Sequence, residues 1–206
     1  MRMPHLAELA VRYHRTTSIS HFAPLLSKSG FKRLHIKNRS IVQAGSEGFF
    51  LALASPDAQL EALDLSGSYF GRESAESVGT ALAKNRSLRE LDLSNTTDEQ
   101  ETKYLVHSLS SALPQNQTLR VLRMRYLDLD FRDVKWLFQS LLQNVGLSEI
   151  DLRDNEEIGE IGAREVVRVV HELQRRAKRS MLVHMSHLSC EERAALEAEE
   201  KSRAAE

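Results

Sequence analysis

A short apolar phrase, repeated at nearly constant spacing, constrains the fold of this 206-residue chain more than any other feature. Its clearest copy, residues 88–95, reads Leu-Arg-Glu-Leu-Asp-Leu-Ser-Asn. The second apolar position of successive copies falls at intervals of 29, 28, 31 and 28 residues, at Leu34, Leu63, Leu91, Leu122 and Ile150. A period of this size is the signature of a solenoid, in which each unit stacks on the next.

Each unit combines two different apolar periods. The fourth and sixth positions of the phrase alternate with polar residues, which is the period of a β-strand. Between the phrases, apolar residues recur three and four apart, so helices are expected within residues 75–82, 98–113, 130–142 and 158–174. Because parallel strands need a crossover, each helix supplies one. The sequence predicts an α/β solenoid, a short curved horseshoe with parallel strands on the concave face and helices on the convex face.

The two ends of the chain differ from the repeats. Residues 1–29 are predicted to form an N-terminal helical cap, with one helix over the first fifteen residues. A second short helix is expected to tolerate Pro24 only in its first turn. The array of five to six units spans residues 30–188, with a degraded last strand at 181–185. Residues 189–206 are predicted to form a polar C-terminal helix.

Three asparagines, Asn85, Asn116 and Asn144, each stand three residues before the first leucine of a phrase. Asparagine tolerates the left-handed conformation that often ends a helix. The placement therefore predicts that these residues turn the chain from helix to strand in that conformation. Two glycine pairs, at 45–48 and 159–162, lack the lysine and spacing of a phosphate-binding loop and are predicted to be strand-to-helix turns.

The phrase and its period resemble the leucine-rich repeat family over roughly residues 30–175. The full helix in each unit is similar to the family's ribonuclease-inhibitor-like class. Asn155 stands where the family places its asparagine or cysteine ladder, and the other units carry Arg39, Ser68, Thr96 and Leu127 there. The resemblance implies protein binding through the concave face. Some actin pointed-end cappers and intracellular immune sensors carry such arrays.

The polar positions of the phrase are expected to point away from the core and to form columns across neighbouring strands. Arg123 would then lie beside Asp92 and Asp151. Two interpretations remain open: an internally paired ladder of ions, or a charge-patterned docking surface for a partner. The candidate partner-binding residues are Lys32, Arg33, His35, Lys37, Asp64, Arg89, Glu90, Asp92, Arg120, Arg123, Arg125, Tyr126, Asp151 and Arg153.

Charge and cysteine content limit the partners and the compartment. The formal net charge of −1 gives no whole-molecule case for nucleic acid or membranes. Residues 1–40 are nevertheless basic, so a tether to nucleic acid or another anionic surface is the alternative function. The single cysteine, Cys190, rules out a disulfide framework within the chain and favours an intracellular, cytoplasmic protein. A mitochondrial presequence in residues 1–21 is a second possibility.

No catalytic constellation emerges from the sequence, and neither an enzyme activity nor a cofactor is predicted. His184, His187 and Cys190 are spaced three apart, but incidental surface histidines explain them better than a metal site does. The absence of a run of about 18 apolar residues argues against integral membrane contact. The sequence therefore predicts a non-enzymatic interaction scaffold or assembly subunit, which binds an unidentified protein through the concave face or the array ends.

Overall fold

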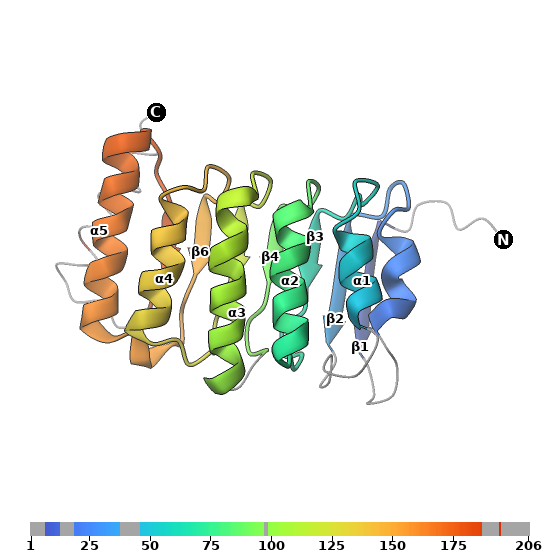
Figure 1. The fold of residues 1–206 in the computed structure, drawn as a ribbon, viewed down its shortest axis with the longest axis horizontal. Helices are drawn as coiled ribbons and strands as arrows, with labels where there is room; N and C mark the ends of the chain where they lie inside the picture. The colour runs from blue at the N-terminus through green and yellow to red at the C-terminus, as the bar shows by residue number, and fades with distance from the viewer. Residues whose placement is uncertain (1–6, 13–18, 38–45, 97–98, 187–193, 195–206) are drawn as a thin grey trace.

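The fold is one open sheet of parallel strands covered by a row of helices (Figure 1). The computed structural model describes residues 7–12, 19–37, 46–96, 99–186 and 194. Seven described strands follow one another in chain order, so the backbone hydrogen bonds of the sheet join each unit only to its neighbours. The strands are β1 (Glu8–Arg12), β2 (Arg33–Lys37), β3 (Ala62–Asp64), β4 (Glu90–Asp92), β5 (Val121–Arg123), β6 (Glu149–Asp151) and β7 (Leu182–His184). The predicted α/β solenoid is confirmed, with its strands on the concave face.

The helices lie side by side on the convex face of the sheet (Figure 1). The described α-helices are α1 (Ser46–Leu53), α2 (Arg72–Lys84), α3 (Glu99–Ala112), α4 (Phe131–Leu141) and α5 (Gly159–Ala177). Three short 3-10 helices accompany them, η1 (Ile19–Leu25), η2 (Leu113–Gln115) and η3 (Glu156–Ile158). Helix α4 begins as its sequence predicts. Asp130 accepts hydrogen bonds from the backbone N–H groups of Arg132 and Asp133, and the Asp133 side chain accepts one from Asp130 in return.

The leucines of the phrase form the core between the two layers. Leu88, Leu91 and Leu93 are each at most 2% exposed, and the corresponding positions of the other units are equally buried. Each such side chain contributes about 1.5–3 kcal/mol when fully buried. No single unit can bury its apolar face alone, so this layer of leucines is what stacks the units.

The three asparagines before the phrases do not adopt the predicted left-handed conformation. Asn85 and Asn116 have φ angles of −63° and −93°, and that prediction was wrong. Their side chains are fully buried and link successive units instead. The Asn116 amide donates to the carbonyls of Leu82 (2.7 Å) and Asn85 (3.2 Å). Its side-chain oxygen accepts from the N–H groups of Thr118 and Leu119. Buried backbone groups that would otherwise lack partners are satisfied in this way.

Asn85 and Asn144 repeat this pattern in their own units, so the three residues form an asparagine ladder. Asn85 donates to Leu53 O, and Asn144 donates to Leu113 O and Asn116 O. After the last asparagine, the guanidinium of Arg179 donates to the carbonyl of Asn144. We call the side of the solenoid that carries this ladder the helix-to-strand edge, and the opposite side the strand-to-helix edge.

The N-terminal segment departs from its predicted helix. Residues 8–12 form β1, which pairs in parallel with β2 and places Glu8 opposite Arg33. The apolar residues of this segment have helical spacing, but the segment forms a strand because it pairs with the otherwise free edge of β2. The next segment is the 3-10 helix η1, in which Pro24 is the sixth of seven residues, so the first-turn prediction is also wrong. A 3-10 helix of seven residues makes only a few i to i+3 hydrogen bonds, so it tolerates a proline, which has no N–H to donate.

The glycine pair at 159–162 is only partly a turn. Gly159 has a φ of +56° and joins η3 to α5, but Gly162 already lies inside α5. A Cβ atom at Gly162 would lie 2.5 Å from the Ile158 side chain, which explains the second glycine by close packing. The predictions for Gly45, Arg39, His187, Cys190 and the helix over 189–206 concern residues outside the described part of the chain, Ala194 apart.

Candidate interaction surface on the concave face

The polar positions of the strands come together on one surface, which we call the strand wall. The register aligns His35, Asp64 and Asp92 on successive strands, followed by Arg123 and Asp151. Neighbouring strands in such a ladder lie about 4.8 Å apart, so side chains in one column can contact each other. The expected neighbours of Arg123, namely Asp92 and Asp151, do flank it in the register.

The N-terminal half of the strand wall is a set of ion pairs between adjacent units. Lys32 Nζ lies 2.8 Å from Glu61 Oε1, and this hydrogen bond lowers the pKa of Glu61. The His35 ring lies between two carboxylates, 3.2 Å from Glu8 and 3.1 Å from Asp64. Burial raises the pKa of Asp64, but hydrogen bonds from Ser66 and His35 outweigh burial, so the pKa is lowered overall. The basic first unit is thus largely neutralised by its neighbours.

In the middle of the strand wall, Glu90 lies between two arginines. Its carboxylate is 3.8 Å from Arg33 and 3.6 Å from Arg123. Arg123 therefore pairs with Glu90, although Asp92 and Asp151 are its neighbours in the register.

The aspartates at the fifth position of the phrase each accept a hydrogen bond from their own turn. Asp64 and Asp92 each accept a hydrogen bond from the backbone N–H two residues later, at 2.8 and 2.9 Å. Asp151 does the same with Arg153 at 3.1 Å. This side-chain-to-backbone turn ends each of these strands. The sequence signal was the aspartate recurring at one position of the phrase.

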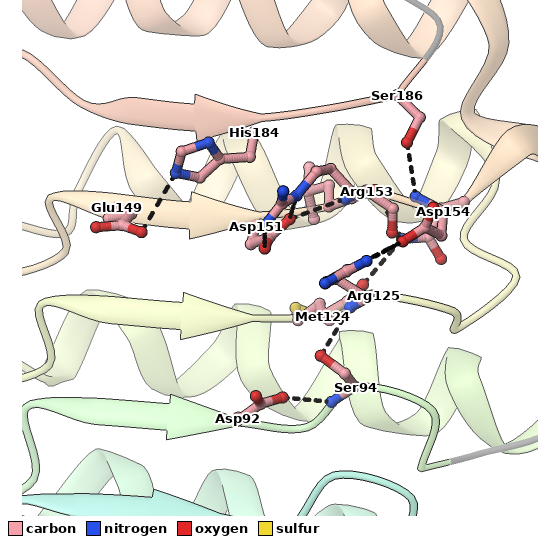
Figure 2. Close-up of polar contacts among 12 residues, drawn as sticks. Asp92, Ser94, Met124, Arg125, Glu149, Asp151, Arg153, Asp154, His184 and Ser186 are labelled. Atoms are coloured by element: carbon pink, nitrogen blue, oxygen red, sulfur yellow. Dashed lines mark hydrogen bonds and ion pairs between the residues drawn. The ribbon is translucent and has the colours of Figure 1, made fainter.

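The C-terminal half of the strand wall carries its strongest ion pairs (Figure 2). Arg153 contacts both oxygens of Asp151, with Nε 2.9 Å from Oδ1 and Nη2 2.6 Å from Oδ2. Arg125 donates twice to Asp154 Oδ2, at 3.0 and 2.6 Å. These hydrogen bonds raise the pKa of both guanidinium groups. Burial raises the pKa of Asp151, but the bonds from Arg153 prevail and lower it overall.

Asp154 was not recognised from the sequence, because its partner Arg125 lies 29 residues away. Figure 2 shows how the surrounding loop is fixed: Asp154 N–H donates to Ser186 Oγ at 2.9 Å, and Arg125 N–H donates to Ser94 Oγ at 3.1 Å. On the neighbouring strands His184 Nε2 lies 3.3 Å from Glu149. Residues of four successive units therefore take part in holding the two arginines in place.

Tyr126 is the exposed aromatic residue of this region. Its side chain is 56% exposed, and the Arg125 guanidinium lies 5.6 Å from its ring centroid. Its φ of +51° is held by the next unit, because Asn155 Oδ1 accepts from the N–H groups of Leu127 (2.8 Å) and Leu129 (3.3 Å). Asn155 thus occupies the ladder position that the resemblance implied, and it also fixes the loop that presents Tyr126.

The remaining candidates lie at the margins of the strand wall. Lys37 is exposed at the end of β2, and Arg89 is exposed just before β4. Arg120 is turned toward the helix-to-strand edge, where its Nη1 donates to the carbonyls of Gly146 (2.5 Å) and Gln117 (3.1 Å). Arg89 and Arg120 are therefore residues of that edge as much as of the concave face.

Metal-binding clusters and helices that could cross a membrane are both absent from the described residues. Within them, no group of three or more histidine, cysteine, aspartate or glutamate side chains is arranged to hold a metal ion. None of the helices in the described part of the chain has the length and apolar character needed to cross a membrane.

The fold and the comparisons define a leucine-rich-repeat-like protein. No family model matches the chain. Human NACHT, LRR and PYD domains-containing protein 13 is 28% identical over 132 residues, which cover 64% of this chain but only 12% of that protein. The tropomodulin C-terminal domain of Caenorhabditis elegans superposes with a TM-score of 0.59 at 18% identity, covering 75% of this chain and 93% of that one. Actin-binding site 2 of leiomodin-1 gives 0.53 at 18% identity, covering 66% and 77%. These two likenesses concern the fold alone.

Proposed function

We propose that the protein is a non-enzymatic scaffold that binds another protein through the strand wall, with Tyr126 at the centre of the contact. The observation that carries the proposal is an exposed tyrosine held rigid between Arg125 and the loop fixed by Asn155. Tyrosine and arginine are enriched among the residues that dominate binding energy at interfaces. A preformed anchor also loses little conformational entropy on binding.

The ion pairs of the strand wall are compatible with docking. The side chains of Arg123 and Glu90 are 35% and 36% exposed, and that pair spans 3.6 Å. Exposed pairs of this kind contribute about 0–1 kcal/mol each. The carboxylates of a partner protein can therefore replace those of the strand wall beside its arginines at a small cost in free energy. In this proposal the ladder of paired ions and the docking surface are the same surface. Its side chains pair with one another in the free protein and with the partner in the complex.

The comparisons support a protein partner in general. The human relative is named for its leucine-rich repeats and the leiomodin-1 neighbour for actin binding. We further propose that the array belongs to the ribonuclease-inhibitor-like class, because α-helices of 11 to 19 residues follow strands β3 to β6. A single cysteine supports an intracellular subunit of a larger assembly, in the cytoplasm.

The test is affinity capture from cell extract with quantitative mass spectrometry, and purified actin as an additional direct probe. Tyr126→Ala and Arg123→Glu are expected to lose proteins that the wild-type chain captures, by about tenfold or more for the tyrosine. Arg164→Glu is the matched control, because Arg164 is an exposed arginine of helix α5 that pairs only with Glu160 among the described residues.

Two outcomes oppose the proposal. If the captured proteins respond equally to Arg123→Glu and Arg164→Glu, the strand wall is not the binding surface. If they are lost only from chains that lack residues 1–6 or 195–206, binding resides at the ends of the array. Circular dichroism of each variant separates lost binding from lost folding.

A further inference from the structure

A small basic pocket lies on the helix-to-strand edge, away from Tyr126. Its volume is about 220 Å³, and we call it the edge pocket. It is built from the segments that enter four successive strands, β2, β3, β4 and β5. Its lining residues are Lys32, Ala58, Gln59, Glu61, Arg86, Ser87, Arg89 and Thr118.

The edge pocket has more cations than its one carboxylate can neutralise. Glu61 is already bound to Lys32 at 2.8 Å. Arg86 uses its Nη1 on the carbonyls of Ala83 (2.8 Å) and Asn85 (2.9 Å), so its guanidinium is fixed in position while the rest of the group stays available. The Arg89 guanidinium makes no hydrogen bond or ion pair with any described residue. Two positive charges are thus left for an external anion.

The asparagine ladder holds these residues in place. Asn85 Oδ1 accepts from the N–H groups of Ser87 (2.9 Å) and Leu88 (2.6 Å), and Asn116 Oδ1 accepts from Thr118 N–H at 3.0 Å. The turns that carry the lining arginines and hydroxyls therefore cannot relax freely around a ligand. A preorganised site of this kind binds its ligand at a smaller entropic cost.

The ordinary role of cations at helix ends does not account for the whole pocket. A positive side chain near a helix C-terminus is favoured by the helix dipole, and this explains Arg86 after helix α2. Lys32 and Arg89 lie just before strands β2 and β4, beyond the last turn of any described helix. Lys32 is accounted for by its pair with Glu61, so Arg89 is the lining cation that neither a helix end nor an ion pair with a described residue explains.

We propose that the edge pocket binds a carboxylate side chain of an acidic peptide segment from a partner protein. Its volume lies below the roughly 300–1,000 Å³ of small-molecule sites, which suits the end of one side chain. The lining contains no aromatic residue on which a nucleic acid base could stack.

The same edge continues in a way that suits an extended acidic segment. In the unit after the edge pocket, the Arg120 guanidinium lies on the carbonyl of Gly146, 2.5 Å away. Beyond it, Arg179 binds the carbonyl of Asn144. Neither arginine has a carboxylate partner among the described residues. Successive carboxylates of one extended peptide could therefore reach the edge pocket and then these two arginines.

The experiment measures fluorescence anisotropy of a labelled short oligoglutamate with the full chain. Binding is expected in dilute salt and to weaken as the ionic strength rises to about 0.15 M, because salt screens exposed charges. Arg89→Glu is expected to weaken binding by about tenfold or more, whereas Arg89→Lys, which keeps the charge, retains most of it. The matched control Arg164→Glu should leave the affinity within about twofold of wild type.

Three results would overturn the assignment. One is the absence of oligoglutamate binding by the wild-type chain. A second is an equal loss in Arg89→Glu and Arg164→Glu, which would indicate a response to net charge alone. The third is tighter binding of double-stranded DNA than of oligoglutamate with the same sensitivity to Arg89→Glu, which would make the ligand a nucleic acid. Tyr126→Ala is expected to weaken binding at the strand wall but to leave oligoglutamate binding unchanged. It therefore separates a failure of the edge-pocket proposal from a failure of the proposed function.

Discussion

The two edges of the solenoid differ in how their side chains bond to the backbone groups of the turns. On the helix-to-strand edge, three asparagines make nearly identical bonds between units, and the backbone there is regular. On the strand-to-helix edge, the equivalent positions hold Ser68, Thr96, Leu127 and Asn155, and only some of them reach a carbonyl. Residues with positive φ gather on this second edge, at Asn95, Tyr126, Asp128 and Asp154. A uniform edge keeps the units in register, while a variable edge is free to present different side chains.

The largest effect is expected at the centre of the uniform edge. Asn116→Ala leaves the carbonyl of Leu82 and the N–H groups of Thr118 and Leu119 without their partner, at a site where Asn116 itself is fully buried, while Asn85 O keeps its bond from Arg86. Each unsatisfied buried group costs about 1–3 kcal/mol, so unfolding in urea should show a loss of roughly 3–5 kcal/mol. Gln117→Ala, one residue away and exposed, is the control and should change stability by less than about 0.5 kcal/mol. A small change in the free energy of unfolding of Asn116→Ala would mean that water molecules replace the hydrogen bonds of the Asn116 side chain.

A smaller effect is expected on the variable edge, at Asn155. Asn155→Ala should cost roughly 2–3 kcal/mol, because the residue is slightly exposed and water can reach part of the gap. The more telling readout is hydrogen exchange. The amides of Leu127 and Leu129 should lose protection, since Asn155 Oδ1 is their acceptor.

Thr96→Ala provides the comparison on the same edge. Among the described residues its hydroxyl donates to Leu93 O and to no other group, so we expect a loss of about 1 kcal/mol and unchanged protection at Leu127. Equal exchange behaviour in the two variants would contradict the idea that Asn155 fixes the Tyr126 loop.

The smallest effect concerns pH. The pKa of Asp151 is lowered in the folded state, so its contribution to stability is present above its ordinary value of 3.8 and is lost as the pH falls toward the folded value. Asp151→Asn should therefore flatten the decline of the free energy of unfolding below about pH 4. Glu160→Gln, in an exposed pair on helix α5, should leave that decline unchanged.

The sequence predicted much of the fold. Of the bonds between units, however, it predicted the ladder position on the strand-to-helix edge and missed the asparagine ladder on the helix-to-strand edge. The repeat predicted the strands from β2 onward, the helices α2 to α5 and the position of the Asn155 ladder residue, but not helix α1 between β2 and β3. Periodicity reports which face of an element is buried, and the core depends on that. It carries no information on bonds between units, so Asn116 was predicted to turn the chain rather than to bridge two units.

The strand wall shows the same limit. Its columns follow from the register, and the register follows from the repeat. Arg123 pairs with Glu90 rather than with its neighbours in the register, and the pair of Arg125 with Asp154 spans 29 residues, so neither pair follows from the columns. Strand β1 was predicted as a helix because the free edge of β2 that it covers is not visible in the spacing of its own residues.

The asparagine ladder also has a consequence for how the array comes apart. In a linear stack, cooperativity depends on the coupling between nearest neighbours relative to the stability of each unit. A buried side chain that bonds the backbone of the preceding unit is such a coupling, and it is repeated at Asn85, Asn116 and Asn144. Because each bridge breaks when either unit opens, the middle of the array should melt as one block, with Arg179 as the last link on its C-terminal side.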